Sequence, residues 1–151
     1  MRREKKWRYY CDFCKKSGGS GGHMKKHEKH CTMNPDRVCS MCEYIGMSEQ
    51  KPIAELVAVV PNWEDYAVEE EDWVNHSTYI SLNSKWEPAI NEAVKKLREL
   101  TCDCPACILA ALRQSVSNMN FVPYATFNFS AEMKERLKDC SEDHSINACY
   151  P

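Results

Sequence analysis

The clearest hydrophobic pattern lies in the second half of the chain. In residues 86–100, WEPAINEAVKKLREL, apolar side chains recur every three or four positions, which predicts an amphipathic helix with one buried face. A second helix is predicted over residues 105–116, because Pro105 suits a first helical turn and an apolar run follows it. Residues 130–138 predict a short third helix with Ser130 as its N-cap.

The remaining segments have weaker patterns. Residues 52–60, PIAELVAVV, suit either a buried strand or a short helix, and periodicity does not decide between them. Residues 61–75 are acidic and aromatic and predict a loop, whereas residues 77–82, STYISL, predict a short strand. Residues 120–129 alternate weakly, and Pro123 favours a loop or an edge strand there. These elements together predict an α+β fold.

Composition narrows the class of protein. Of 151 residues, 43% are hydrophobic and 28% are charged, which is typical of a globular chain. No apolar run approaches the ~18 residues of a membrane span, and no apolar segment follows the basic N-terminus as in a secretory signal. We therefore expect a cytoplasmic protein with no membrane partner.

Cysteine is the unusual residue, with ten copies, of which six form three Cys-x-x-Cys pairs. Such pairs place two thiolates on one turn, facing one tetrahedral ion, and in a reducing compartment they indicate zinc. A disulfide framework in an exported protein is the alternative interpretation.

The first predicted zinc site lies in residues 9–31, YYCDFCKKSGGSGGHMKKHEKHC. Cys11 and Cys14 are followed after twelve residues by His27, and after three more by Cys31. Four residues separate the last two ligands, so on a helix they share one face. This spacing resembles the family of small ββα zinc fingers, with Cys in the last place, where His is commoner.

The resemblance implies two short strands and a helix, with an apolar helix residue packed under the metal. Met24 occupies that position, and Ser20 is expected to cap the helix. The usual aromatic residue after the second Cys is replaced by Gly18, and we expect Tyr10 or Phe13 to fill the space.

Two alternatives remain open for this segment. His30 is a second candidate for the last ligand, but its spacing is short, so His23 and His30 are expected to be exposed helix residues. The stretch SGGSGGHM resembles an engineered linker with a cloning scar, which would make residues 1–16 a foreign piece. Its exact fit to the finger spacing favours a natural origin.

A second zinc site is predicted from two knuckles, Cys39 with Cys42 and Cys104 with Cys107. The second knuckle begins a predicted helix, whose N-terminus stabilises thiolates. The sequence thus predicts two structural zinc ions. Four other residues are alternative or additional ligands: Cys102, Cys140, His144 and Cys149.

The chain is expected to divide into a basic arm and finger, residues 1–33, and a mainly helical, zinc-closed domain, residues 34–151. This domain contains an acidic insertion, residues 43–100, and a C-terminal tail, residues 139–151. Residues 1–42 have eleven Lys or Arg against four Asp or Glu, whereas the insertion has five against twelve. The basic part is a candidate phosphate-binding face, or it docks on the acidic part of its own chain or of a neighbour.

Nucleic-acid binding is the first functional hypothesis. In a ββα finger, the helix positions that face bases would be Ser20, His23 and Lys26. One finger covers about three base pairs, so binding would be weak and salt-sensitive. The candidate contact residues are Arg8, Ser20, His23, Lys25, Lys26 and Lys29.

The alternative is a zinc-stabilised protein-interaction module, with the acidic, aromatic segment 63–73 as its exposed feature. An enzyme is not expected, because all-protein zinc spheres leave no position for water, and His76 is the only free general-base candidate, in a poor pattern. We expect no small-molecule substrate.

The whole chain also resembles small cysteine-rich proteins encoded by tailed bacteriophages. The stretches HMKKHEKHCTMNPDRVCSMC and CPACILAALRQS carry this resemblance. It implies an infected bacterial cytoplasm as the setting and supplies no activity. Independently of it, we expect an accessory role in nucleic-acid binding or regulation. The partners would be DNA, RNA, or a host or phage protein.

Overall fold

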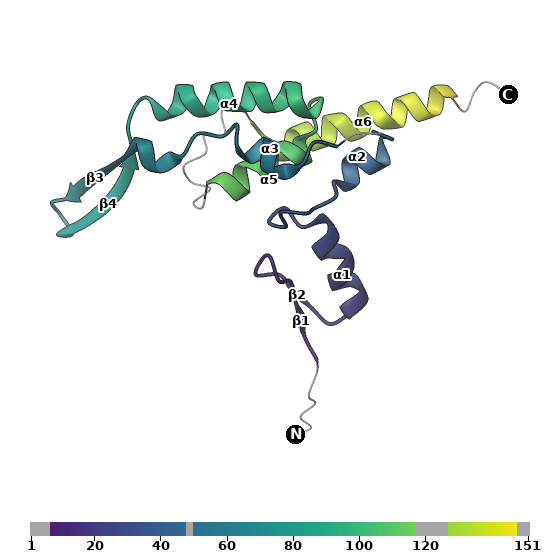
Figure 1. Ribbon diagram of the computed structural model, residues 1–151, viewed down its shortest axis with the longest axis horizontal. Helices are drawn as coiled ribbons and strands as arrows, with labels where there is room; N and C mark the ends of the chain where they lie inside the picture. The colour runs from purple at the N-terminus through teal and green to yellow at the C-terminus, as the bar shows by residue number, and fades with distance from the viewer. Residues whose placement is uncertain (1–6, 48–49, 117–126, 148–151) are drawn as a thin grey trace.

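The computed structural model describes residues 7–47, 50–116 and 127–147, with side chains up to residue 139. A small zinc-finger-like unit precedes a larger, mainly helical part, and a long hairpin projects from one end (Figure 1). The predicted α+β class is confirmed.

The N-terminal unit has the ββα order that the resemblance implied. Strands β1 (Tyr9–Tyr10) and β2 (Ser17–Gly18) pair antiparallel and are followed by helix α1 (Gly21–His30). Ser20 caps α1 as predicted, since its hydroxyl oxygen accepts a hydrogen bond from the His23 N–H. Met24 is buried on the inner face of the helix, also as predicted.

The expected replacement for the missing aromatic residue is wrong. Tyr10 and Phe13 are both exposed. The methyl group of Met24 lies instead 3.6 Å from where a Cβ of Gly18 would stand, so methionine fills the space. The ring of Tyr9 lies against Gly21, where a Cβ would come within 3.1 Å of the ring.

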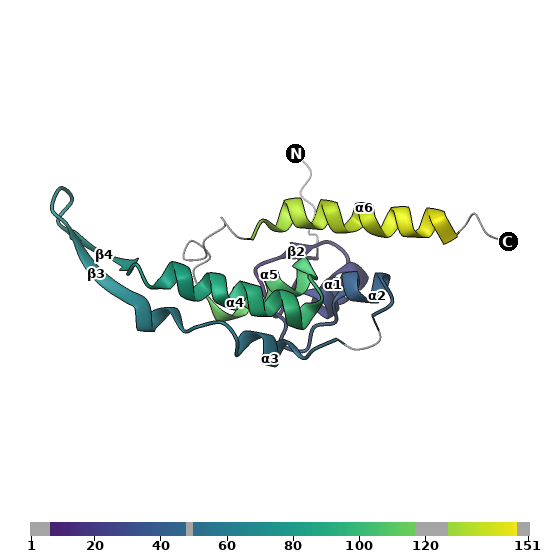
Figure 2. The same ribbon diagram turned by 90° about the horizontal axis from the view of Figure 1, so that it is seen from above.

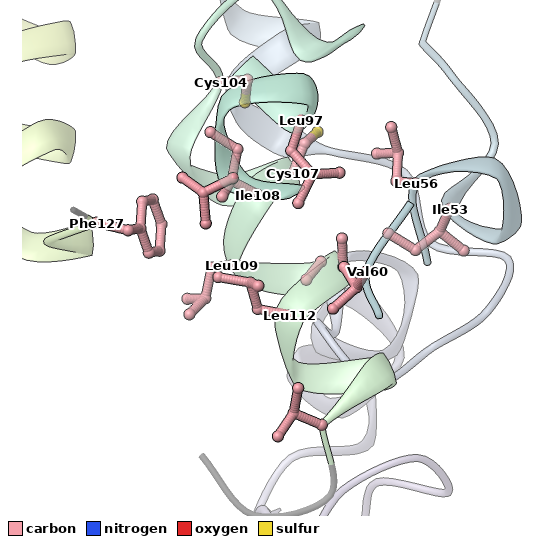
Figure 3. Packing of buried hydrophobic residues seen from close by; sticks show 14 of the residues in the cluster. Ile53, Leu56, Val60, Leu97, Cys104, Cys107, Ile108, Leu109, Leu112 and Phe127 are labelled. Atoms are coloured by element: carbon pink, nitrogen blue, oxygen red, sulfur yellow. The ribbon is translucent and has the colours of Figure 1, made fainter. Parts of the chain in front are cut away.

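Helix α5 (Pro105–Ser115) is the centre of the helical part. Its apolar residues are buried on nearly all sides, which requires neighbours all round. Helices α3 (Ile53–Val57), α4 (Trp86–Thr101) and α6 (Phe129–Asn147) pack against it. In Figure 3, Phe127 lies on the opposite side of α5 from Ile53 and Leu56. The predictions of helices over 86–100 and 105–116 are confirmed.

The ambiguous segment 52–60 forms a short helix, α3, over Ile53–Val57, followed by a turn. Ile53, Leu56 and Val60 are buried, a spacing that fits one side of a helical turn rather than a strand. Earlier in the chain, a five-residue helix, α2 (Ser40–Tyr44), begins directly after Cys39 and contains Cys42 of the first knuckle.

The prediction of a loop over residues 61–75 is wrong. A 3₁₀ turn over Trp63–Tyr66 leads into strand β3 (Ala67–Asp72), which pairs antiparallel with β4 (Ser77–Leu82), the predicted strand. Both faces of β3 are exposed, so no alternation of polar and apolar residues marks it in the sequence. Figures 1 and 2 show this β3–β4 hairpin extending away from the helices.

The last helix differs from its prediction in length and cap. Helix α6 begins at Phe129 and extends to Asn147, well beyond residue 138. Its cap is Asn128, whose Oδ1 accepts from the Ala131 N–H at 3.1 Å, and not Ser130. Of the predicted segment 120–129, residues 120–126 lie outside the described residues.

Candidate metal centres

The finger brings its four predicted ligands together. Cys11 follows β1, Cys14 lies between the strands, His27 is on α1, and Cys31 caps the helix. Their ligand atoms all lie within 4.8 Å of one another, and Cys14 Sγ is 3.2 Å from His27 Nε2. Tetrahedral zinc with ordinary bond lengths places such atoms about 3.6 Å apart, so the group fits the ion.

Backbone amides support the sulfur atoms of the finger. The Lys16 N–H donates to Cys14 Sγ over 3.5 Å between nitrogen and sulfur. Burial acts to raise the pKa of Cys14, but this amide and the neighbouring thiols lower it overall. Burial raises the pKa of Cys31 to about 11, against a backbone hydrogen bond from Met33. Because desolvation disfavours a thiolate at Cys31, a bound cation is what would hold it ionised.

The four-cysteine group joins two helix N-termini. Cys39 is the N-cap of α2 and Cys42 lies within that helix, whereas Cys104 is the N-cap of α5 and Cys107 lies in its first turn. The chain reverses sharply between α4 and the second knuckle. Cys102 and Asp103 form this turn, with left-handed φ values of 49° and 57°.

The geometry of this group is that of a zinc–thiolate tetrahedron. Sγ of Cys42 lies 3.5 Å from Sγ of Cys104 and 3.7 Å from that of Cys107, and Sγ of Cys39 lies 3.7 Å from that of Cys104. Zinc–sulfur bonds of about 2.3 Å give tetrahedron edges of about 3.8 Å. These sulfur separations are far longer than a disulfide bond of about 2.05 Å.

All four sulfurs are buried, and their crowding disturbs their ionisation. Hydrogen bonding to Cys104 lowers the pKa of Cys39, and hydrogen bonding within the group raises the pKa of Cys107. Thiols packed this closely hold a full set of negative charges only around a cation. The two groups of four are therefore consistent with two zinc ions, the predicted number.

The structure describes only some of the alternative ligands. Cys102 is exposed in the left-handed turn and belongs to neither group. His30 is half-buried rather than exposed as expected, with Nδ1 2.8 Å from the Val38 carbonyl oxygen, whereas His23 is exposed. The side chains of Cys140, His144 and Cys149 lie outside the described residues.

The predicted nucleic-acid contacts differ in how far they are already engaged. Arg8 Nη1 donates to Ser17 Oγ at 3.0 Å, and Lys29 Nζ pairs with Glu43 at 2.9 Å. Ser20 Oγ is the helix cap. The side chains of three residues are exposed and make no ion pair or hydrogen bond with any other described side chain: His23, Lys25 and Lys26.

Sequence reasoning missed the contacts that hold the finger against the helices. Gln114 Nε2, on α5, donates to the carbonyl oxygens of Thr32 at 2.8 Å and Asn34 at 3.1 Å. Arg37 Nη1 donates to the Ala106 carbonyl oxygen at 3.2 Å. These are side-chain to backbone bonds between distant segments, and no local pattern in the sequence marks them.

Comparison with protein-family models, with curated proteins and with solved structures finds no match to this chain. The finger resemblance therefore rests on its ligand spacing and on the ββα order, and the phage resemblance rests on sequence stretches alone. Among the described residues, no helix is both long enough and apolar enough to span a membrane.

Proposed function

We propose that the protein is a zinc-stabilised nucleic-acid-binding protein in which both ions are structural and α1 is the contact element. Each group supplies four protein ligands, which fill a tetrahedral sphere and leave no position for a water nucleophile. This closed coordination supports a structural rather than a catalytic role for the metals.

The observation that carries the proposal is the pair Lys25–Lys26 on the solvent-facing side of α1. Both side chains are exposed and unengaged, and His23 is exposed one turn earlier. With α1 beginning at Gly21, Lys26 and His23 occupy the sixth and third helix positions, which face bases in ββα fingers. Residues 7–33 carry six Lys or Arg against two Asp or Glu, so the surrounding field favours phosphate.

The anchoring of the finger supports the same interpretation. Its contacts with α5 run through Thr32 and Asn34, beyond the C-terminal end of α1. Figure 1 shows α1 and the β1–β2 hairpin extending away from α3, α4, α5 and α6, and α1 meets α2 only near its C-terminal end, where Lys29 pairs with Glu43. The part of the finger that would meet a nucleic acid is therefore uncovered.

The expected binding is weak and salt-sensitive, because one finger spans about three base pairs and phosphate contacts release counterions. Such an affinity suits an accessory or regulatory protein. The setting we propose, taken from the phage resemblance, is the cytoplasm of an infected bacterium.

The test compares two pairs of adjacent lysines. Binding of short fluorescent DNA and RNA oligonucleotides is measured by anisotropy over a range of salt concentrations for the Lys25→Ala/Lys26→Ala variant. The matched control is Lys95→Ala/Lys96→Ala, an exposed pair on α4.

In a plot of log affinity against log salt, the finger variant should have a slope shallower by about 2, at about 0.9 per lost phosphate contact. The control variant should keep the wild-type slope. Equal slopes for both variants, or no binding at low salt, would refute the proposal. Binding to a host protein that survives the finger substitutions would favour the protein-interaction alternative.

A further inference from the structure

The β3–β4 hairpin is a two-stranded sheet with neither face covered. Nearly all of its residues are exposed, and at its tip Trp73 is 81% exposed and Val74 is 86% exposed. An isolated hairpin of two strands is only marginally stable in water, and its open edges invite pairing. A surface of this kind is better explained by a docking role than by packing within its own molecule.

One face of the hairpin has its charges engaged. Glu70 accepts hydrogen bonds from Tyr79 Oη at 2.7 Å and from Ser81 Oγ at 2.6 Å. Asp72 accepts from the Val74 and Asn75 N–H groups and so holds the turn. These two carboxylates are part of the hairpin's own structure.

The opposite face is different. The register pairs Glu69 with Ile80 and Glu71 with Thr78, so these four residues share one side of the ribbon, called here the acidic face. Neither Glu69 nor Glu71 has an ion-pair or hydrogen-bond partner among the described residues. Ile80, opposite Glu69, is 52% exposed. The acidic face thus combines free negative charge with an exposed apolar side chain.

The finger is the complementary surface. Residues 67–82 contain four Asp or Glu and no Lys or Arg, whereas residues 7–33 have an excess of four basic residues. The finger also exposes apolar rings beside its charges, at Trp7 and Tyr10. Figures 1 and 2 both show the hairpin at one end of the molecule, away from the finger, so a single molecule does not bring the two together.

We propose that the acidic face of the hairpin docks on the basic finger of a second copy of this chain. Two copies arranged antiparallel satisfy both contacts at once, which closes the assembly as a dimer. Opposite charges set the orientation and the apolar side chains between them contribute the affinity. The dimer proposal uses the same surface of the finger as the proposed nucleic-acid contact, but it names a different ligand. Failure to bind nucleic acid would therefore leave the dimer proposal intact.

The test is a charge exchange read by sedimentation velocity of the full zinc-bound chain. One variant carries Glu69→Lys/Glu71→Lys and the other carries Lys25→Glu/Lys26→Glu. Each alone brings like charges together, whereas a mixture of the two pairs opposite charges at both contacts. We expect each variant alone to associate at least about tenfold more weakly than the wild type, and the equimolar mixture to recover association.

Recovery in the mixture also shows that both variants are folded, and their zinc content and far-ultraviolet dichroism are checked independently. The matched control is Glu87→Gln/Glu99→Gln, which removes two exposed carboxylates from α4, compared with Glu69→Gln/Glu71→Gln. Only the hairpin pair should weaken association, and about 0.5 M salt should weaken the wild-type dimer. A wild-type chain that stays monomeric at low salt and high concentration, or a mixture that fails to associate, would overturn the proposal.

Discussion

A chelator that removes zinc should unfold the finger before it affects the helical part. In the finger, Met24 is the one buried residue that clusters with the ligand cysteines. Burial of a methionine contributes about 1.5–3 kcal/mol, whereas a structural zinc ion contributes about 10–16 kcal/mol in small peptides. The metal therefore outweighs the apolar contact several-fold, and the finger should not fold without it.

The order of release follows from access. In the finger, Cys14 and His27 are only half-buried, whereas all four cysteines of the second group are buried beneath α2 and α5. A chelator should therefore reach the finger ion first. Helix α1 has 10 residues, about a seventh of the described residues in α-helices, so loss of the first ion should remove a similar fraction of their helical dichroism.

The assay combines a chelator titration, a colorimetric zinc indicator and far-ultraviolet dichroism. Cys14→Ser should remove the first step only, and Cys42→Ser should abolish the melting transition of the helical part. Cys102→Ser is the matched control, because this thiol is exposed and outside both groups. Unchanged dichroism and melting after complete loss of metal would refute the reasoning, as would release of the four-cysteine ion first.

Three further predictions concern the helical part and the hairpin. Leu112→Ala, at a fully buried position on α5, should lower the free energy of unfolding by about 2–5 kcal/mol in urea denaturation, whereas the exposed Leu137→Ala should change it by less than about 0.5 kcal/mol. Arg98 holds Glu132 through two hydrogen bonds of 2.8 and 3.0 Å, so a double-mutant cycle should give a coupling of about 1 kcal/mol between α4 and α6, and additive effects would contradict this contact. The hydrogen bonds from Ser81 and Tyr79 lower the pKa of Glu70, so they stabilise the hairpin fully above the ordinary pKa of 4.5, and this stabilisation is lost as the pH falls through the lowered pKa. NMR shifts of the hairpin should report this pH dependence, and Glu70→Gln should abolish the pH dependence.

The sequence predicts most reliably where one interaction dominates. The finger follows from ligand spacing, because zinc fixes four side chains whatever the loop between them contains. Helices α4 and α5 follow from strong apolar periodicity and, for α5, from Pro105 at its start. In both cases a local signal and the final environment agree.

The failures lie where tertiary contacts decide. Strand β3 is a run of acidic residues that becomes a strand only because β4 pairs with it. Ser130 is a good N-cap by residue type, but the helix begins earlier, and Asn128 Oδ1 accepts the hydrogen bond from the Ala131 N–H. The link between the finger and α5 is a hydrogen bond from the Gln114 side chain to the Thr32 carbonyl oxygen. These residues are far apart in the sequence, so no local sequence pattern predicts their contact.

The two metal groups differ in how far apart their ligands lie along the chain, and this sets the order in which they form during synthesis. The ligands of the finger all emerge together, whereas Cys42 and Cys104 are 62 positions apart. At about 5–20 residues per second, the first knuckle therefore waits about 3–12 s on the ribosome for its partner. During that interval Cys39 and Cys42 are unpaired thiols next to a completed finger, and they compete with it for the same zinc. Zinc supply during translation, rather than afterwards, is thus the condition under which this chain is most open to mismetallation.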